Sequence, residues 1–277
     1  MSPDEYCQQK AAASGSSFYY SFLFLPPERR RAITALYAFC REVDDVVDEC
    51  ADPAVAAATL AWWRNEVAAL FAGTPQHPVT KALAPAVEHF GVTQARLNEI
   101  LDGMAMDLHH ARYPDFAGLE RYCYHVAGVV GLLAAGIFGY ANPQTLKYAE
   151  TLGTAFQLTN IIRDVGEDAR KNRIYLPQDE LAQFGVPAAD ILNARQTVGF
   201  GRLMAFQIDR AKGYYERALA LLPPEDRKPQ RPGLVMAAIY RTLLDEIRQD
   251  GSRVLAHRVA LTPIRKLWIA WRTWVAA

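Results

Sequence analysis

Two groups of acidic residues lie far apart in the sequence, and the spacing within each group places its side chains on one face of a helix. The first group is the segment 44–48, Asp-Asp-Val-Val-Asp, and the second lies between residues 160 and 168. Residues three and four apart are neighbours on a helical surface, so each group forms an acidic stripe. Like charges at this spacing repel, which favours a bound cation, and ligands that are all oxygen indicate Mg²⁺. The candidate Mg²⁺ ligands from this spacing are Asp44, Asp48, Asn160, Asp164 and Asp168.

Both stripes extend beyond their acidic residues. The first continues through Arg41 and Tyr37, and the second through Gln157, with apolar residues on the flanks of each. A solvated acidic face is the alternative for one stripe taken alone, but two stripes can face each other across a cavity and hold cations together with diphosphate oxygens. Gly166 lies inside the second helix at a cost of about 1 kcal/mol relative to Ala, which is better tolerated where a site requires it.

Basic residues adjoin both stripes. Arg41 and Arg163 lie within them, and the segment 170–173, Arg-Lys-Asn-Arg, follows the second. Guanidinium groups bind phosphate oxygens in a bidentate manner, so these residues are candidates to bind diphosphate. A salt bridge to a neighbouring carboxylate is the alternative for Arg163. The early segment 14–20, Ser-Gly-Ser-Ser-Phe-Tyr-Tyr, offers either an anion-binding cradle or an ordinary helix N-cap.

Helices must position these residues, because helical periodicity dominates the chain and no alternating strand pattern with hairpin turns occurs. We therefore expect an all-α protein, with breaks at Pro-containing sites near residues 26, 75, 114, 143 and 177. Residues 223–233 form the only segment that resembles a linker, and a single amphipathic helix over about 234–255 follows it. We therefore predict one domain over residues 1–277.

Composition limits the function. The chain of 277 residues is 51% hydrophobic, 22% charged and of zero net charge, which is typical of a globular protein and gives no electrostatic reason to expect nucleic acid as a partner. The four cysteines form no C-x-x-C pair and no signal peptide is recognisable, which indicates a reduced, cytoplasmic setting.

Two apolar segments need interpretation. Residues 126–141 are too short for a membrane span and predict a buried core helix, whose small residues allow close packing or leave an apolar channel. Near the end of the sequence, Trp268, Trp271 and Trp274 lie beside the basic residues Arg265, Lys266 and Arg272. Docking onto the domain is the default for this Trp/Arg segment, and peripheral contact with a membrane is the alternative.

Four segments together resemble the squalene/phytoene synthase family of head-to-head isoprenoid synthases. They are Ser17-Phe18, the stretch from Tyr37 to Asp48, the stretch from Tyr122 to Gly128, and the stretch from Gln157 to Asp168 with Arg173-Ile174-Tyr175-Leu176-Pro177 after it. The resemblance covers nearly the whole chain. It implies a single-domain isoprenoid synthase helical bundle with a central cavity, Mg²⁺ as cofactor and two prenyl diphosphates as substrates.

The resemblance also implies roles for individual residues. Asp44, Asp45, Asp48, Asn160, Asp164 and Asp168 would bind Mg²⁺. Catalytic roles would fall to Tyr37 and Arg41 together with Asp44, Asp48, Asp164 and Asp168. The substrate would be bound by Ser17, Phe18, Arg41, Tyr122, Val126, Gln157, Asn160, Arg163, Arg173, Tyr240 and Arg258.

Within the family, residues 17–31 most resemble the bacterial hopanoid-associated synthases. This similarity implies that two molecules of farnesyl diphosphate are joined to presqualene diphosphate with release of diphosphate. The alternatives are a phytoene or dehydrosqualene synthase and a full squalene synthase that uses NADPH. Outside the family, a class I terpene cyclase shares the metal-assisted ionisation, whereas a di-iron carboxylate bundle is excluded because no Glu has His three residues later.

Overall fold

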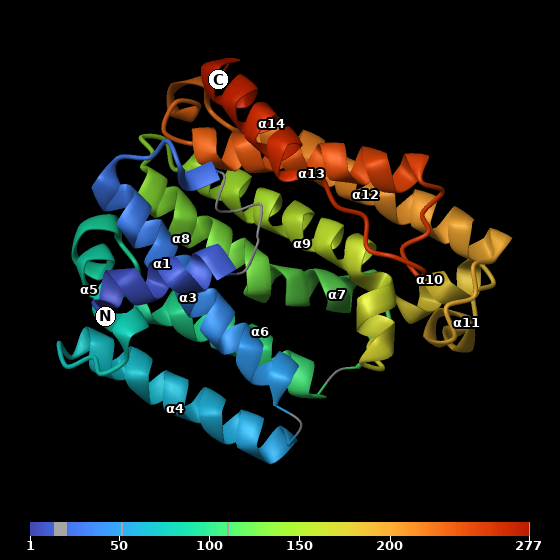
Figure 1. Cartoon of the computed structure of the whole chain (residues 1–277), viewed down its shortest axis with the longest axis horizontal. Helices are drawn as coiled ribbons and strands as arrows, with labels where there is room; N and C mark the ends of the chain where they lie inside the picture. Colours follow the sequence, from blue (N-terminus) through green and yellow to red (C-terminus); the bar gives the residue numbers. More distant parts are fainter. Residues whose placement is uncertain (14–20, 51, 110, 277) are drawn as a thin grey trace.

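The computed structural model describes residues 1–13, 21–50, 52–109 and 111–276. Within these ranges the fold is all-α, as predicted, and the only β-type pairing is an isolated bridge between Arg112 and Ile174. The helices are α1 (Pro3–Ala13), α3 (Pro27–Glu49), α4 (Pro53–Phe71), α5 (Pro78–Phe90), α6 (Gln94–His109), α7 (Phe116–Cys123), α8 (Val129–Phe138), α9 (Gln144–Arg170), α10 (Gln178–Gln183), α11 (Ala188–Leu192), α12 (Val198–Leu221), α13 (Arg231–Gln249) and α14 (Pro263–Ala276) (Figure 1).

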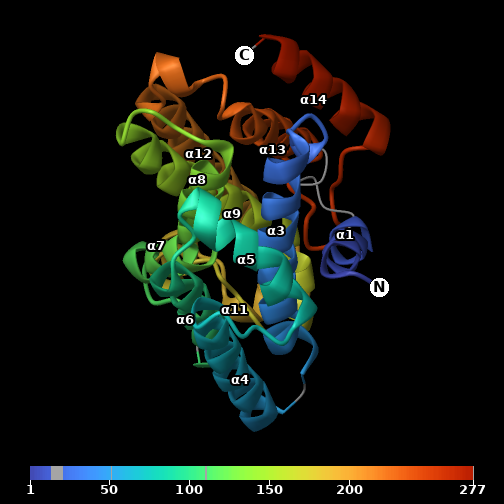
Figure 2. The same ribbon diagram turned by 90° about the vertical axis from the view of Figure 1, so that its left-hand side faces the viewer.

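Helix α9 lies in the middle of the molecule and is the longest element, with 27 residues (Figures 1 and 2). It packs against α8, α12 and α13. Apolar residues are buried along most of its length, because neighbouring helices cover all but its polar stripe. Helix α3 buries Leu36, Phe39 and Val43 and leaves its own polar stripe directed away from that core.

Proline marks many of the helix ends, as the sequence predicts. Pro27, Pro53 and Pro78 occupy the first turns of α3, α4 and α5, where the missing N–H needs no partner. Pro143 and Pro177 precede α9 and α10. The predicted breaks near residues 26, 143 and 177 are therefore confirmed.

The break predicted over residues 223–233 is confirmed between α12 and α13, but the segment is packed against the domain and does not behave as a linker. Asp226 is buried at 1% exposure and its carboxylate accepts hydrogen bonds from the backbone amides of Ala141 and Asn142, at 2.7 and 2.9 Å, and from Thr145 Oγ1 at 2.6 Å. These bonds fix a short 3₁₀-helix, Pro224–Asp226, to the turn between α8 and α9. The helix expected over 234–255 begins earlier, at Arg231, and ends at Gln249 before Gly251, which has a φ of 71°.

Helix α7, a π-helical turn at Tyr124–Gly128 and helix α8 form one continuous apolar stretch, Phe116–Phe138. Among the described residues, it is the one helical stretch whose length and composition would allow it to cross a membrane, and 56% of its most apolar window is buried inside the structure. The π-turn and α8 pack against α6 and α9.

Glycine allows this apolar stretch to approach α9 closely. A Cβ atom added at Gly131 would lie 2.3 Å from the carbonyl oxygen of Ala149, and one added at Gly153 would lie 2.3 Å from that of Ala127. The small residues therefore serve close packing. The same helix also lines an apolar cavity, which is described below. Its small residues therefore serve both close packing and an apolar space.

Candidate active site

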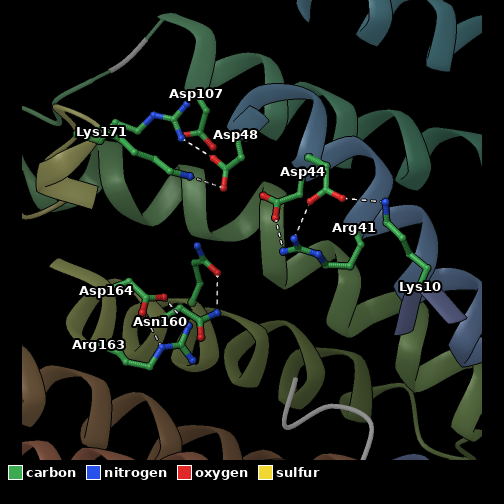
Figure 3. A network of polar contacts seen from close by, with 12 residues as sticks. Lys10, Arg41, Asp44, Asp48, Asp107, Asn160, Arg163, Asp164 and Lys171 are labelled. Atoms are coloured by element: carbon green, nitrogen blue, oxygen red, sulfur yellow. Dashed lines mark hydrogen bonds and ion pairs between the residues drawn. The ribbon is translucent and has the colours of Figure 1, made fainter. Parts of the chain in front are cut away.

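The two acidic stripes face each other across a polar pocket with about 1280 Å³ of empty space (Figure 3). Helix α3 contributes Asp44 and Asp48, and α9 contributes Asn160, Asp164 and Asp168. The remaining lining residues are mostly charged or aromatic: Arg41, Asp107, Tyr122, Gln157, Ile161, Arg163, Glu167, Arg170, Lys171, Arg173, Tyr175 and Arg258. Stripes 116 residues apart in the sequence, counted from Asp44 to Asn160, thus form one site.

Ion pairs hold the first stripe in place. Arg41 donates through Nη1 to Asp44 at 2.7 Å and through Nη2 to Asp45 at 2.6 Å. Lys10 on α1 also pairs with Asp45, at 2.8 Å. Asp45 therefore faces α1, and it is absent from the residues that line the pocket. Of the six predicted Mg²⁺ ligands, Asp45 is the one that the fold turns away from the others.

Asp48 connects α3 to the segment that follows α9. Arg173 Nη1 lies 2.7 Å from Asp48 Oδ1, and Lys171 Nζ lies 3.1 Å from Oδ2. Arg173 also donates to the backbone carbonyl of Val47 at 2.9 Å. Burial alone would raise the pKa of Asp48, but the hydrogen bonds from Arg173 and Lys171 outweigh it and lower that pKa.

The second stripe is held by two arginines and contains one unsatisfied acceptor. Arg163 forms a bidentate pair with Asp164, and Arg258 Nε lies 3.0 Å from the same carboxylate. Gly166 makes the second contact possible, because its missing Cβ lets the backbone at Val254 pass directly over α9 on the way to Arg258. Asn160 donates to Gln157 at 3.3 Å, while its Oδ1 is buried without a hydrogen-bond partner in the described structure.

Burial and like charges raise the pKa of two carboxyl groups that line the pocket between the stripes. Burial, followed by the charge of Asp48, raises the pKa of Asp44 to about 7. Burial, followed by the charges of Asp164 and Asp48, raises the pKa of Asp168 to about 8. Buried carboxylates that repel one another favour a bound cation, as does the unpartnered oxygen of Asn160. The donor set of carboxylate and amide oxygens matches what Mg²⁺ takes in proteins.

The carboxylates of the two stripes can bind Mg²⁺ only if they give up their present ion pairs with arginine. Among the described residues, no three acidic, histidine or cysteine side chains are already gathered around one point. The reason is that Arg41, Arg163 and Arg173 each hold a carboxylate of the stripes. An incoming ion would take over those oxygens and release the guanidinium groups toward the anion that accompanies it.

A buried cluster adjoins the pocket, and Asp107 is the one of its three members that lies outside the family motifs. Asp107 on α6 accepts hydrogen bonds from the hydroxyls of Tyr122, at 2.8 Å, and Tyr175, at 2.9 Å. Burial raises the pKa of Asp107 to about 6, although both hydrogen bonds act to lower it. Tyr122 was predicted to bind substrate. Tyr175 stands in the motif segment 173–177, whereas Asp107 carried no signal, because it lies on α6, a separate element from the acidic stripes.

An apolar cavity with about 900 Å³ of empty space lies next to the polar pocket, and the two share Gln157 and Asn160. Tyr37 and Val126 line this cavity rather than the polar pocket. Tyr148, at 1% exposure, lines it twelve residues before Asn160 on α9, which is about 18 Å along the helix at 1.5 Å per residue. A ligand with an anionic head and a long hydrocarbon tail fits this arrangement of a polar and an apolar space.

The other predicted residues are also placed by the fold. Tyr240 is buried, its ring lies 5.1 Å from that of Phe156, and burial raises its pKa against the opposing charge of Arg163. Arg258 stays about half exposed at the rim of the pocket. Ser17 and Phe18 lie outside the described residues.

Comparison with known proteins defines the class. The family model named squalene/phytoene synthase matches residues 11–265. The phytoene synthase of Arthrospira platensis is 38% identical, over 95% of this chain and 89% of that protein. The chain therefore belongs to the squalene/phytoene synthase family, whose members are prenyltransferases that condense prenyl diphosphates head to head.

Solved structures agree in fold. A dehydrosqualene synthase in complex with ligand superposes with a TM-score of 0.88 at 27% identity, over 99% of this chain and 96% of that one. Squalene synthase HpnC from Alicyclobacillus acidocaldarius superposes with a TM-score of 0.79 at 29% identity, over 90% and 94%. The predicted family and fold are confirmed. The sequence relative, however, matches the phytoene synthase alternative better than the presqualene diphosphate synthase that we predicted first.

Proposed function

We propose that this protein joins two allylic prenyl diphosphates head to head, releases one diphosphate and forms a cyclopropylcarbinyl diphosphate. The observation that carries the proposal is the shared border of the two spaces. Gln157 and Asn160 line both the charged pocket and the apolar cavity, so a diphosphate and its hydrocarbon tail are separated at these two residues.

The charged pocket supplies the groups that ionisation of the donor requires. Asp44, Asp48, Asn160, Asp164 and Asp168 would hold Mg²⁺, which when bound stabilises negative charge on the departing diphosphate. Arg163, Arg173 and Arg258 would bind the remaining phosphate oxygens, because the carboxylates that they hold in the free protein would then be engaged elsewhere.

The apolar cavity supplies the environment for carbon–carbon bond formation. As the C1–O bond of the donor breaks, the 2,3-double bond of the acceptor forms a bond to that C1, and positive charge moves to C3 of the acceptor. Loss of a proton from C1 of the donor then closes the cyclopropane. Released diphosphate is the base that we favour, because burial and the neighbouring Asp107 raise the pKa of Tyr122 far above its usual value and keep its hydroxyl protonated.

Different relatives support different chain lengths for the prenyl diphosphate substrate. The similarity to a phytoene synthase supports geranylgeranyl diphosphate as substrate and phytoene as the final product, which forms when the cyclopropylcarbinyl diphosphate loses its own diphosphate and a second proton. The similarity to a dehydrosqualene synthase and to squalene synthase HpnC supports farnesyl diphosphate and presqualene diphosphate, which agrees with our reading of residues 17–31. We therefore retain the farnesyl reaction as the second candidate.

A product assay tests the proposal. The full chain is incubated with Mg²⁺ and without NADPH, first with farnesyl diphosphate, then with geranylgeranyl diphosphate, then with both in equal amounts. We expect a C30 cyclopropyl diphosphate or C40 phytoene, and the mixed incubation ranks the two. Neither product with either substrate, or a cyclic hydrocarbon made from one substrate molecule, would contradict the proposal.

Two variants identify the site that performs the reaction. We expect Asp164→Asn and Asp168→Asn to lower turnover by orders of magnitude, because each removes a negatively charged ligand oxygen from the pocket. Asp209→Asn is the matched control, since Asp209 forms an exposed ion pair with Arg248 on α13 and lines neither space. Unchanged turnover in both pocket variants would assign the reaction to another site.

A further inference from the structure

Helix α14 presents a stripe of large apolar side chains to solvent. Its members lie within about 100° of one another around the helix axis, at 100° per residue. They are Ile264, Leu267, Trp268, Trp271 and Val275, each between 44% and 81% exposed. The opposite face anchors the helix, because Ile269 and Ala270 are buried. At the edge of the stripe, the ring of Trp274 lies 5.2 Å from that of Phe24. The stripe is therefore held outward by a docked helix.

The charges of α14 have one sign. Residues 263–276 contain Arg265, Lys266 and Arg272 and no acidic residue. The guanidinium of Arg272 lies 5.3 Å from the centre of the Trp268 ring, so cationic and aromatic groups adjoin at the edge of the stripe. An amphipathic helix with aromatic residues on one face and basic residues beside them is typical of helices that lie in a membrane interface.

A groove beside the stripe adds more positive charge. It lies between α12, α13 and α14, holds about 950 Å³ of empty space and includes Trp268 in its lining. Arg227, Arg241 and Arg272 line it, no acidic residue does, and none of the three arginines pairs with a carboxylate in the described part of the chain. Three exposed guanidinium groups around an apolar groove fit the phosphates of an anionic amphiphile.

We propose that the stripe on α14 and this arginine-lined groove dock the protein onto the surface of an anionic lipid bilayer. Trp268, Trp271 and Val275 would enter the boundary between headgroups and acyl chains, while the arginines bind lipid phosphates. A second copy of the chain fits less well. In a twofold dimer the same patch faces itself, which would place the unpaired arginines of both copies against each other.

This docking surface is independent of the proposed reaction. None of its residues lines the charged pocket or the apolar cavity. In Figures 1 and 2, α14 lies at one end of the molecule and α4 at the other. Trp62 on α4 is 45% exposed and therefore offers a matched tryptophan on a distant surface.

Vesicle sedimentation with the full chain tests the proposal. The wild type should bind vesicles of phosphatidylcholine mixed with phosphatidylglycerol more tightly than vesicles of phosphatidylcholine alone, and rising salt should weaken the binding. Trp268→Ser combined with Trp271→Ser should lower the partition coefficient at least about tenfold on both vesicle types. Arg227→Gln combined with Arg241→Gln should remove the preference for anionic vesicles. Trp62→Ser should bind as the wild type does.

Other results would overturn the proposal. A wild-type protein that stays in the supernatant with anionic vesicles contradicts it, as does an equal loss of binding in Trp62→Ser. A dimer in light scattering that dissociates in the double tryptophan variant would assign the stripe to a second copy. Circular dichroism and prenyltransferase activity in detergent show whether each variant is folded, so a misfolded variant is replaced by Trp271→Ser alone.

Discussion

Asp107 is the residue whose substitution best separates positioning from binding at the active site. It holds the hydroxyls of Tyr122 and Tyr175, and its charge lies near Arg173, which in turn holds Asp48. We expect Asp107→Asn to lower kcat about tenfold to a hundredfold with little change in KM, because the amide replaces one of the two acceptor oxygens with an N–H donor and so displaces one of the two tyrosines. Steady-state kinetics on both prenyl diphosphates measures this.

The control for Asp107 lies on the same helix. Asp102 forms an ion pair with Arg64, away from both spaces, so Asp102→Asn should keep wild-type kinetics. A rise in KM with unchanged kcat for Asp107→Asn would instead show that the residue contributes to binding of substrate.

Tyr148 is expected to limit the length of the hydrocarbon tail. It is fully enclosed at the part of the apolar cavity remote from Asn160, and its hydroxyl has no hydrogen-bond partner in the described structure. Tyr148→Leu should lengthen the cavity and raise the ratio of kcat/KM for geranylgeranyl diphosphate over farnesyl diphosphate by about tenfold. Tyr148→Phe keeps the ring and should leave the ratio unchanged. Equal ratios in all three proteins would place the limit elsewhere.

The two stripes were predictable at the residue scale because regular spacing on one helix is visible in the sequence. Asp164 and Asp168 lie where the helical period puts them, and both reach the pocket. Asp45 belongs to the same motif, yet the fold turns it toward Lys10 on α1. Helical spacing already separates Asp45 from Asp44, but it could not show that Lys10 is the partner of Asp45, because that depends on which helix packs beside α3.

At the scale of helix pairs, Gly153 sets the separation between α9 and the π-turn before α8. An added Cβ would lie 2.3 Å from the carbonyl oxygen of Ala127, which is backbone and cannot move without shifting the turn. We expect Gly153→Ala to lower the free energy of unfolding by about 3 kcal/mol through overpacking. Denaturant unfolding monitored by circular dichroism measures the change.

Gly213 on α12 provides the opposite case. Nothing lies within 4 Å of a Cβ built there, and its backbone is helical. Gly213→Ala should therefore stabilise the protein by up to about 1 kcal/mol, since alanine has the higher helix propensity. Equal destabilisation by both substitutions would show that close packing at Gly153 is not the cause.

Asp226 fixes a connection between helices and makes stability depend on pH. Burial would raise its pKa, but the hydrogen bonds from Thr145, Ala141 and Asn142 outweigh it and lower that pKa. A lowered pKa in the folded state adds stability at pH values above the ordinary Asp pKa, and this stability is lost as pH falls through the lowered value. We expect Asp226→Asn to destabilise by about 2 kcal/mol at pH 7.

The difference between the wild type and Asp226→Asn should shrink as the pH is lowered below the ordinary pKa of Asp, since the wild-type carboxyl then becomes neutral as well. Unfolding free energies measured at pH 7 and in the acid range check this. Asp209→Asn, at an exposed position, should follow the wild type throughout. A constant difference across the range would mean that Asp226 stabilises by shape rather than by charge.

At the scale of the whole molecule, the two stripes belong to different cores. Val43 and Val47 beside the first stripe pack in one hydrophobic core, and Ile161 and Val165 beside the second pack in the other. Ligands bound between the stripes should tie these cores together. We expect Mg²⁺ and inorganic diphosphate together to raise the melting temperature by about 5 °C, and either alone by much less.

Thermal shift measurements with and without a chelator test this coupling. Asp168→Asn should reduce the shift, because it removes a ligand from one stripe, whereas Asp209→Asn should preserve it. A full shift in Asp168→Asn, or no shift in the wild type, would show that the ions do not bridge the stripes.

The overall architecture was largely predictable, because proline positions and helical periodicity are local properties. The helix class and the ends of α3, α9 and α10 follow from them. The break at residues 223–233 was predictable from their proline content, but their packing was not, because the burial of Asp226 depends on a turn some 80 residues earlier. Long-range pairing of that kind leaves no pattern in a single sequence.

The border at Gln157 and Asn160 has a consequence for the fidelity of the proposed reaction. Water reacts rapidly with an allylic cation that is exposed to solvent and converts it to a prenyl alcohol. In this protein the carbon end of the breaking bond would lie in the apolar cavity, whose walls include Tyr37 and Phe156. Water would be confined to the charged pocket around the phosphate end. The fraction of substrate that is hydrolysed to a prenyl alcohol should therefore be low in the intact enzyme. Farnesol or geranylgeraniol among the products would show that water reaches the apolar cavity.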